Sequence, residues 1–416
     1  MSPRRIGRDK RDNCVLRLAP EGRSALAFRM RIRHGRSFLA CIFVMCATQV
    51  LATPATNAAP TSLAPRRCAW LSQGRLAYVD RLGLVVCSAR SAVRLTQTAD
   101  VRELLWSADG ARLRYVVGSE TERHFVFNVR SNRSVQLGDD CGFVAFTWCR
   151  QYKGADGSTL VISRPRRLPG GISSAPEVVT LRDGNRVVSI HGALPDEFVP
   201  LTFPKARRVL IFHAPEIGAD EWFDGMLLSV LDFNHGERLL GIRVHGTRTW
   251  ATLSPDGSTL IASAGGFREA FQRKTLVRCD LAKARCRPWH HLAGFVELDP
   301  VWSPDGTRVA FIRARDVTEA QLTSDIGTMP EPWAEGRRLV LTSAAAEPEP
   351  AVFATSVDRV ESPAWIGSSQ LAFVSRDRLF DVDENGTTHF RLVLAAPARA
   401  AYYGDANTSD RYAWHA

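Results

Sequence analysis

The sequence has none of the short motifs that mark the common enzyme active sites. It contains no Gly-x-Ser-x-Gly elbow, no His-Glu-x-x-His zinc motif, no phosphate-binding glycine loop and no dinucleotide-binding fingerprint. It also contains no Cys-x-x-Cys pair and no ligand spacing that suits zinc. We therefore predict no catalytic residue, no metal ligand and no cofactor. Whether the chain is an enzyme stays open, with a non-catalytic role preferred.

Two pairs of adjacent polar residues come nearest to a catalytic group. Asp139–Asp140 could supply two carboxylates, and His290–His291 could supply two imidazoles. Each pair lies at an expected turn or strand end, and adjacent strand residues point to opposite faces. A solvated turn is therefore the preferred interpretation of both pairs.

The N-terminal apolar run is too short to span a bilayer comfortably as a helix. Residues 38–52 (FLACIFVMCATQVLA) fall short of the roughly 20 residues that a spanning helix needs. The run follows a basic region and precedes small residues, which is the order of a secretory signal peptide. We predict cleavage after Ala52 and a periplasmic or secreted protein, with an uncleaved anchor as the alternative. The true start stays open between Met1 and Met30, because Met30 already begins a complete basic region.

The positive charge is concentrated in the same segment. The chain has a formal net charge of +11, of which residues 1–52 carry +8. The remaining chain carries only +3, too little to indicate a nucleic-acid partner. We expect no nucleic acid, membrane contact through the signal peptide alone, and a monomer.

Six cysteines follow the predicted cleavage site, an even number that suits disulfides in an oxidising compartment. They are Cys68, Cys87, Cys141, Cys149, Cys279 and Cys286. Cys279 and Cys286 lie on the two arms of one expected hairpin, so we predict that they form a disulfide. The connectivity of the other four stays open.

A turn sequence repeats along the chain after a Pro/Ala/Thr-rich linker at residues 53–65. In such a turn Pro presets φ, Asp hydrogen-bonds the backbone ahead of it, and Gly takes the left-handed conformation. We expect the apolar residue before the turn, usually Trp, to pack between neighbouring sheets. The three clearest copies are Trp106-Ser-Ala-Asp109-Gly110, Leu253-Ser-Pro-Asp256-Gly257 and Trp302-Ser-Pro-Asp305-Gly306.

Each turn precedes a strand with an apolar, any, apolar triplet, and seven such triplets occur at irregular spacing. They begin at Leu76, Leu113, Leu160, Val209, Leu260, Val309 and Leu371. Further strand candidates joined by turn-forming residues follow each triplet. The pattern predicts an all-β fold, a β-propeller of about seven four-stranded blades with a range of six to eight. An open β-sandwich is the alternative.

The repeat resembles that of TolB-like propellers, which share a WD40-like Ser-Pro-Asp-Gly turn with a preceding Trp and a following apolar-x-Phe strand. The resemblance covers roughly residues 66–394 and is sharpest around Asp109, Asp256 and Asp305. We therefore divide the chain into a leader and signal peptide (1–52), the linker (53–65), the propeller (66–394) and a C-terminal tail (395–416). The tail completes a blade, caps the channel or is disordered.

The long connections indicate where binding occurs. In a propeller, the connections between the second and third strands of each blade lie on one face, and three of them are long: residues 213–225, 264–273 and 313–336. Long loops on one side of a rigid scaffold are common binding sites. Glu221, Trp222, Phe223 and Trp333 are our candidate binding residues because rigidly held, exposed aromatics anchor protein and carbohydrate contacts. The other interpretation, which we prefer for the aromatics, is that Trp222, Phe223 and Trp333 pack their own loops onto the propeller.

The preferred function is a protein- or glycan-binding scaffold in the cell envelope. The TolB-like resemblance implies an envelope protein or a cell-wall polymer as the partner. The alternative is a lactonase-like or lyase-like propeller enzyme with a metal in its central channel, acting on a small molecule or glycan. Ligands dispersed over several blades would escape any motif search.

Overall fold

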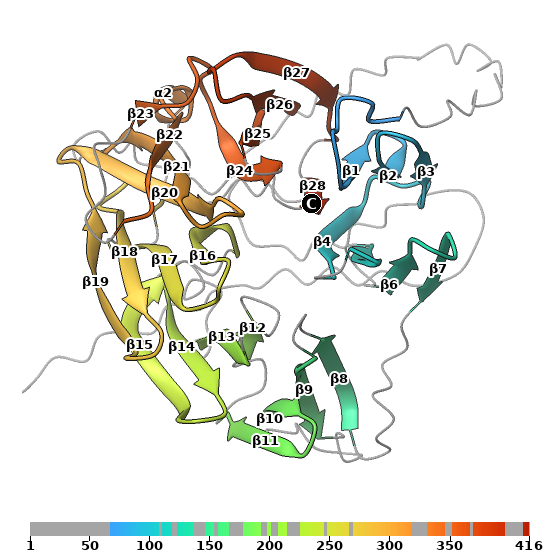
Figure 1. Cartoon of the computed structure of the whole chain (residues 1–416), viewed down its shortest axis with the longest axis vertical. Coiled ribbons are helices and arrows are strands. Elements are labelled where there is room, and N and C mark those ends of the chain that lie inside the picture. The colour runs from blue at the N-terminus through green and yellow to red at the C-terminus, as the bar shows by residue number, and fades with distance from the viewer. Residues whose placement is uncertain are drawn as a thin grey trace, which may run out of the picture. The chain divides into compact units, whose positions relative to one another are not determined.

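The chain folds into seven four-stranded antiparallel sheets, seen in a computed structural model that describes residues 67–395 and 411–415 (Figure 1). Every described element belongs to one compact unit, Ser62–Ala416. Gaps in the described range fall at 108–109, 119–122, 137–145, 154–156, 166–177, 193–197, 201–206, 214–224, 245–247, 266–268, 318–330, 346–351 and 367–368. The predicted signal segment lies outside the described residues. Among the helices that are described, none has the length and apolarity to cross a membrane.

We number the sheets as blades one to seven and give their strands from the inside outward. Blade one contains β28 (Tyr412–His415), β1 (Arg75–Asp80), β2 (Gly83–Cys87) and β3 (Ala92–Arg94). Blade two contains β4 (Val101–Trp106), β5 (Arg112–Val117), β6 (Arg123–Asn128) and β7 (Arg133–Gln136). Blade three contains β8 (Phe146–Lys153), β9 (Thr159–Pro165), β10 (Val178–Asp183) and β11 (Arg186–His191).

Blade four contains β12 (Phe198–Pro200), β13 (Arg208–His213), β14 (Met226–Asp232) and β15 (Gly236–Val244). Blade five contains β16 (Ala251–Leu253), β17 (Thr259–Ala264), β18 (Thr275–Asp280) and β19 (Arg285–His290), preceded by the 3-10 turn η1 (Arg248–Trp250). Blade six contains β20 (Phe295–Trp302), β21 (Arg308–Arg315), β22 (Arg338–Ser343) and β23 (Val352–Phe353), with the short helix α2 (Glu331–Glu335) before β22. Blade seven contains β24 (Glu361–Ile366), β25 (Gln370–Ser375), β26 (Arg378–Val382) and β27 (Thr388–Val393).

The predicted fold and blade number are confirmed. Each of the seven apolar triplets lies in the second strand of its blade, from β1 to β25. Blades four and five are joined through a single residue pair, Val244 with Ala264, and are otherwise separate.

Alternation along each second strand supplies apolar groups to both neighbouring blades. In β13, Leu210 and Phe212 pack into a cluster shared with blades five to seven, whereas Val209 and Ile211 pack with blade three. Because successive strand residues point to opposite faces, a strand that is apolar throughout can be buried on both sides. The sheets therefore stack around an axis, and their mutual burial stabilises the ring.

The Asp-Gly turns form as predicted. The Asp305 carboxylate accepts hydrogen bonds from the Ser303 hydroxyl (2.5 Å), the Thr307 backbone N–H (3.1 Å) and the Thr307 hydroxyl (2.8 Å). These bonds favour the ionised form and lower the pKa of Asp305 to about 2. Gly306 has φ +72°, the left-handed conformation that glycine adopts without strain.

Asp256 repeats this geometry with Ser254 and Ser258, and its pKa is likewise lowered to about 2. Gly257 and Gly110 also have positive φ, whereas Asp109 lies outside the described residues.

In three blades, a tryptophan near the end of the innermost strand bonds to the blade before it. The indole N–H of Trp302 donates to the Thr252 carbonyl in blade five (3.2 Å), and that of Trp365 donates to the Val301 carbonyl in blade six (3.2 Å). Trp106 makes the same bond to Ala413 in β28 (3.1 Å). The repeated Trp thus combines interblade packing with a hydrogen bond between innermost strands.

Substitution of this indole tests the interblade bond. In Trp302→Phe the ring contact is largely kept but the Thr252 carbonyl loses its donor, so we expect the free energy of unfolding to fall by about 1–2 kcal/mol. Urea unfolding followed by far-UV circular dichroism measures this change. A variant as stable as the wild type would show that the bond contributes nothing.

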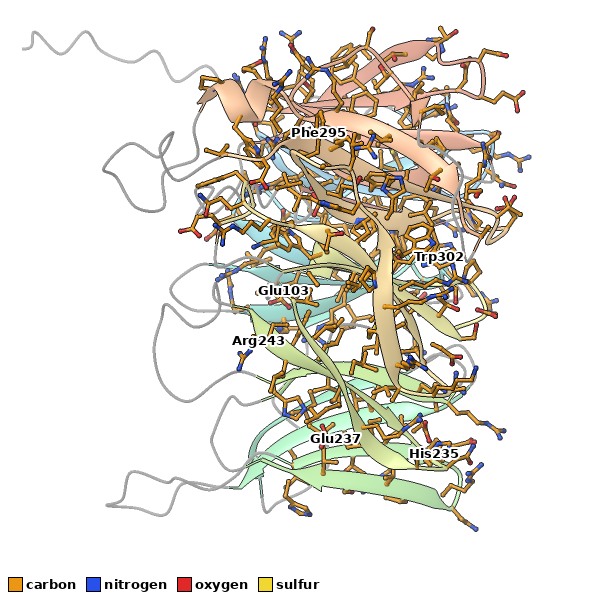
Figure 2. The ribbon with its side chains drawn as sticks, turned by 90° about the vertical axis from the view of Figure 1, so that its left-hand side faces the viewer. Glu103, His235, Glu237, Arg243, Phe295 and Trp302 are labelled. Carbon is orange, nitrogen blue, oxygen red and sulfur yellow. A yellow bond between two sulfur atoms is a disulfide. The ribbon has the colours of Figure 1, made fainter. Side chains whose placement is uncertain are left out.

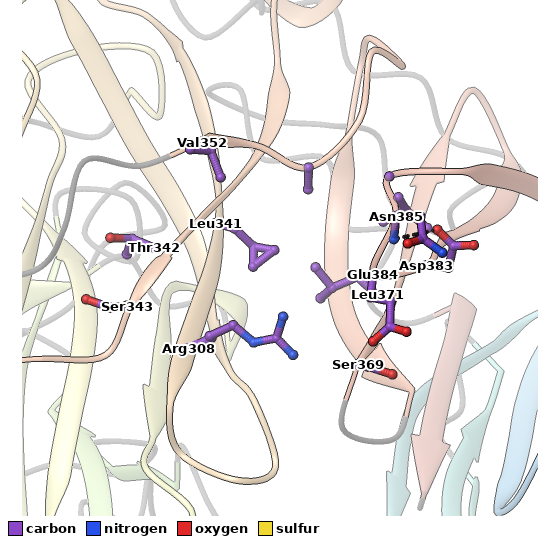
Figure 3. Close-up of a pocket in the computed structure, with 13 residues that line it drawn as sticks. Arg308, Leu341, Thr342, Ser343, Val352, Ser369, Leu371, Asp383, Glu384 and Asn385 are labelled. Atoms are coloured by element: carbon purple, nitrogen blue, oxygen red, sulfur yellow. Dashed lines mark hydrogen bonds between the residues drawn. The ribbon is translucent and has the colours of Figure 1, made fainter.

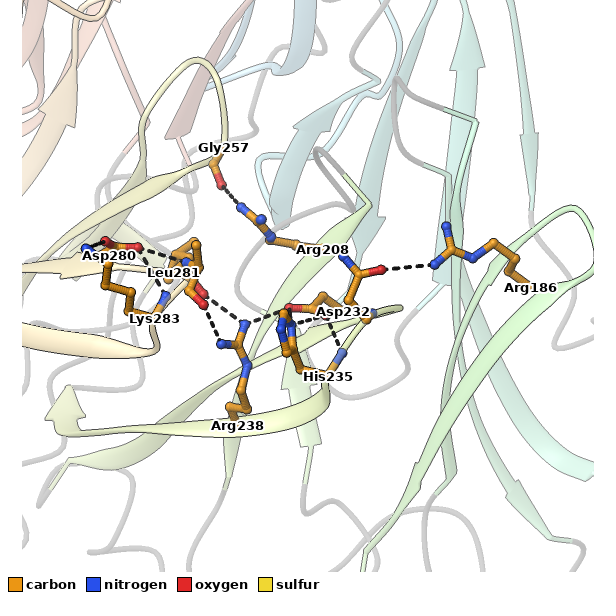
Figure 4. Close-up of polar contacts among 11 residues, drawn as sticks. Arg186, Arg208, Asp232, His235, Arg238, Gly257, Asp280, Leu281 and Lys283 are labelled. Carbon is orange, nitrogen blue, oxygen red and sulfur yellow. Dashed lines mark hydrogen bonds and ion pairs between the residues drawn. The ribbon is translucent and has the colours of Figure 1, made fainter.

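At the same end of the strands as the Asp-Gly turns, arginines link the hairpins of adjacent blades (Figure 4). Asp232 accepts the backbone N–H groups of Asn234 and His235, both at 2.8 Å, which fixes the blade-four hairpin. Arg238 donates to Asp232 (2.7 Å) and also to the carbonyls of Leu281 (2.9 Å) and Ala282 (2.7 Å) in blade five. The buried Asp232 carboxylate thereby orients Arg238, which links blade four to blade five.

The C-terminal strand closes the ring. In β28, Tyr412, Ala413, Trp414 and His415 pair antiparallel with residues 75–78 of β1. The tail was predicted as a segment apart from the propeller, with completion of a blade as one of three alternatives. The structure places its residues 412–415 in blade one, so the sheets of the propeller extend beyond residue 394.

Two disulfides are present among the described residues. Cys279 and Cys286 are bonded across the β18–β19 hairpin, in the predicted pairing. Cys68 is bonded to Cys87 in β2, which fastens the segment ahead of β1 to blade one. Cys68 and Leu71 also pack in the cluster shared by blades one and seven. This second disulfide therefore lies at the seam where the ring closes.

Candidate functional site

The propeller has two distinct faces, which we name by their connections. The link face carries the connections between blades and those between second and third strands; the turn face carries the Asp-Gly turns and the outer hairpins. Figure 2 shows Phe295, where β20 begins, on the side opposite to Trp302, where β20 ends. The long connections predicted for blades four, five and six follow β13, β17 and β21 on the link face.

Three innermost strands contain a bulge at corresponding positions. The register shifts at Glu103 in β4, at Asp299 in β20 and at Ser362 in β24. These residues have φ of +54°, +48° and +47°, values uncommon for residues other than glycine. Each lies three residues before a repeat tryptophan, Trp106, Trp302 or Trp365. Backbone held in this region often marks a functional position.

Asp299 is the central residue of this region. Its Oδ1 atom is shut off from solvent and has no hydrogen-bond partner among the described residues. Burial raises the pKa of Asp299 to about 6, against a hydrogen bond from Thr249 and the charge of Arg337, which lower it. Asp299 therefore titrates near neutral pH, as few carboxyl groups do.

Groups from four blades surround this carboxyl group. Arg337 of blade six donates to Glu361 of blade seven, and the Tyr412 hydroxyl of blade one donates to the Ser362 carbonyl. Blades one and five are not neighbours in the ring, so side chains from both can meet only close to the axis. We call this set the axial site; it consists of Thr249, Asp299, Arg337, Glu361, Ser362 and Tyr412.

The charges of the axial site are internally balanced apart from Asp299. Glu361 accepts from Arg337, which also lies over the Trp333 ring at 5.4 Å, so its position is fixed. Burial raises the pKa of the Tyr412 phenol, and the nearby Asp299 charge adds to this effect. Tyr412 therefore acts as a hydrogen-bond donor at physiological pH.

A second buried ionic group lies between blades five and six. The Glu297 Oε1 atom contacts His290 Nδ1 (2.8 Å) and Arg313 (2.7 Å). Nearby, the Lys274 ammonium lies 5.8 Å from the Trp250 ring centre, and burial lowers the pKa of Lys274 to about 8. These contacts compensate buried charges at the interface between two blades. None of these side chains is a nucleophile that is exposed to solvent.

A Ser–His–Glu set in blade four has the composition of a catalytic triad but not its geometry. His213 Nε2 contacts both the Ser229 hydroxyl (3.0 Å) and Glu237 Oε1 (2.6 Å). In a triad the serine and the acid contact opposite ring nitrogens, so that the base can relay a proton. Ser229 is also fully buried. We interpret this set as structural.

The structure corrects the prediction for Trp333. Only 5% of this residue is exposed; its indole N–H donates to the Arg315 carbonyl (2.9 Å), and its ring packs edge-on against Phe271. Helix α2 turns the side chain inward, so Trp333 packs its own loop rather than offering an exposed anchor. Glu221, Trp222 and Phe223 lie outside the described residues and stay predictions.

The other candidate pairs give no common site. His290 contacts Glu297, whereas His291 is exposed, as expected for neighbours at a strand end. Asp139 and Asp140 lie outside the described residues. Within the part of the chain that the structure describes, no three His, Cys, Asp or Glu residues are grouped so as to hold a metal ion.

No protein-family model and no curated protein matches the sequence. Among solved structures, a putative TolB from Agrobacterium tumefaciens is 13% identical with a TM-score of 0.37, over 68% of this chain and 88% of that one. An oligogalacturonate lyase in complex with manganese is 14% identical (TM-score 0.45, 80% and 89%). The β-propeller domain of the Trilobed protease from Pyrococcus furiosus is 12% identical (TM-score 0.38, 62% and 72%). TolB-like propellers are thus among its structural neighbours, and the seven sheets of the chain itself carry the fold assignment.

Proposed function

We propose that the protein is an exported binding scaffold that takes an envelope protein or a cell-wall polymer at its link face. The main observation in support is that polar groups from four blades converge on the buried axial site, in which Glu361 and Tyr412 begin innermost strands at their link-face end. Propellers expose one continuous surface where loops from many blades meet, which suits a large partner better than a single small pocket. The two disulfides favour an oxidising compartment, since such bonds are rare in the cytosol.

Charged side chains at the link face form the edge of the proposed binding surface. Glu335 pairs with Arg359 (3.1 Å) and with Arg376, which retains 59% side-chain exposure. Arg376 lies in the β25–β26 turn on the link face. An exposed guanidinium beside a rigid polar centre is a suitable contact for a carboxylate-bearing protein or polymer.

A pair of charge reversals tests this proposal. The mature chain, immobilised, captures partners from a solubilised envelope fraction and from purified cell-wall polymer. We expect Arg376→Glu to reduce the recovered partner at least fivefold, because a like charge replaces an attractive contact. Lys283→Glu is the matched control, since Lys283 is also an exposed, ion-paired cation but lies in the β18–β19 hairpin on the turn face. Equal loss in both variants, or in neither, would exclude the link face as the binding surface.

The alternative function, a propeller enzyme, is favoured by one observation. The buried Asp299 carboxyl group, with a pKa of about 6, suits general acid–base chemistry better than an ordinary aspartate does.

Thermal melting with and without Mn²⁺, Mg²⁺, Ca²⁺ and Zn²⁺ tests whether the protein is a metal-dependent enzyme. A metal that binds the folded chain raises its melting temperature. If no ion changes it, the metal-dependent enzyme is excluded.

A further inference from the structure

A cleft of about 510 Å³ separates blades six and seven on the turn face (Figure 3). Its floor is aliphatic and is formed by Leu341, Leu371, Val382 and Ala354. The volume lies within the usual range for small-molecule sites, roughly 300–1,000 Å³. The cleft is separate from the axial site and shares no residue with it.

Opposite charges stand on the two walls. Arg308 belongs to blade six, and Asp383 and Glu384 belong to the β26–β27 hairpin of blade seven. The Arg308 guanidinium lies 4.8 Å from the Trp365 ring centre, which holds its orientation. Asp383 is engaged by the backbone N–H groups of Asn385 and Thr387, both at 2.9 Å. Glu384 is exposed and is therefore the acid that a ligand meets.

Both walls are held rigidly, so that the spacing between the charges is preserved. The Thr355 hydroxyl of the blade-six edge contacts the Thr388 hydroxyl of blade seven at 2.7 Å. The Gly386 N–H donates to the Asp383 carbonyl (3.0 Å), which closes the hairpin turn. A site formed before binding costs little ordering entropy.

The arrangement selects for a ligand with charges of both signs. A simple anion would meet Glu384, a simple cation would meet Arg308, and an uncharged apolar molecule would desolvate both. We propose that the cleft binds a short zwitterionic peptide with aliphatic side chains, its carboxylate at Arg308 and its ammonium group at Glu384. The aliphatic side chains then cover Leu341 and Leu371. This site goes beyond the proposed scaffold function and does not depend on the link face.

Titration with leucyl-leucine tests the proposal, using mature protein labelled at its methyl groups and followed by NMR. We expect saturable shifts confined to the methyl groups of Leu341, Leu371 and Val382, with a Kd of about 1 mM or tighter. N-acetyl-leucyl-leucine and leucyl-leucinamide each remove one charge, and both are expected to bind about fivefold more weakly or worse.

A variant tests the contact at Glu384. Glu384→Gln is expected to weaken leucyl-leucine about fivefold but not to weaken N-acetyl-leucyl-leucine, which has no ammonium group and is only repelled by Glu384. Asp377→Asn, an exposed acid of the same blade outside the cleft, serves as the matched control. Absence of saturable shifts, equal affinity of the blocked peptides, or an unchanged affinity in Glu384→Gln would each overturn the proposal.

Discussion

Deletion of residues 411–416 is expected to abolish the stable fold. The deletion removes β28, leaves residues 75–78 of β1 without their inner partner, and takes away the buried Tyr412 and Arg411. Loss of one large buried aromatic alone costs about 3–5 kcal/mol, and total stability of a domain is about 5–15 kcal/mol. The exposed edge of β1 then favours association with other chains. We expect aggregated or unfolded protein by size-exclusion chromatography and circular dichroism.

Two milder variants show whether the effect of the deletion comes from β28 itself. Deletion of Ala416 alone removes a residue beyond β28 and should leave the melting temperature unchanged. Tyr412→Phe keeps the ring but removes the hydroxyl that donates to Ser362, so a loss of about 1–2 kcal/mol is expected. If the chain lacking residues 411–416 melts cooperatively at the wild-type temperature, β28 does not close the ring.

The second large effect concerns Asp299 and depends on pH. The pKa of Asp299 is raised to about 6 from the ordinary value of 3.8, so the folded state holds its proton more tightly than the unfolded chain does. The stabilising contribution is therefore fully present below pH 3.8 and is lost as pH rises through 6. The loss amounts to about 3 kcal/mol at most.

Asn cannot ionise and tolerates positive φ as well as Asp does, so Asp299→Asn avoids this loss. We expect the variant to match the wild type near pH 4 and to exceed its stability by up to about 3 kcal/mol near pH 8. Urea unfolding across this pH range measures the difference. A variant less stable than the wild type at pH 8 would show that the carboxylate forms a stabilising bond there.

Asp305 supplies a contrasting control. Its pKa is lowered to about 2 by the hydrogen bonds of its turn, so its contribution is present above pH 3.8 and is lost as pH falls through 2. Asp305→Asn should therefore reduce stability at neutral pH, the opposite sign to Asp299→Asn. Similar effects of both substitutions would contradict the assigned environments.

The turn repeat predicts much of the fold because its chemistry is local. Asp305 and Gly306 specify a turn within five residues, and the strand that follows is identified by its own alternation. The Cys279–Cys286 disulfide is predictable for the same reason, since both cysteines belong to one hairpin. The partner of β28 has no local signal, because Tyr412 and Tyr78 are far apart in sequence and only ring closure brings them together.

The axial site could have been found in part. Glu103, Asp299 and Ser362 each stand three residues before a repeat tryptophan, a position that alignment of the copies reveals. Of its other members, Thr249 and Arg337 lie in connections between strands, where there is no repeat to align. For Trp333 the sequence alone does not decide between an exposed anchor and loop packing, because only the packing of α2 against Phe271 buries the indole.

A cysteine pair across the β1–β28 seam tests the central claim most directly. Ala77 and Ala413 are directly paired in the register, and both belong to the cluster between blades one and two. In Ala77→Cys/Ala413→Cys, peptide mapping under non-reducing conditions should recover one intramolecular disulfide joining these residues in a monomer. Recovery of both as free thiols, or of the bond only between separate chains, would contradict a seven-bladed ring closed by its C-terminal strand.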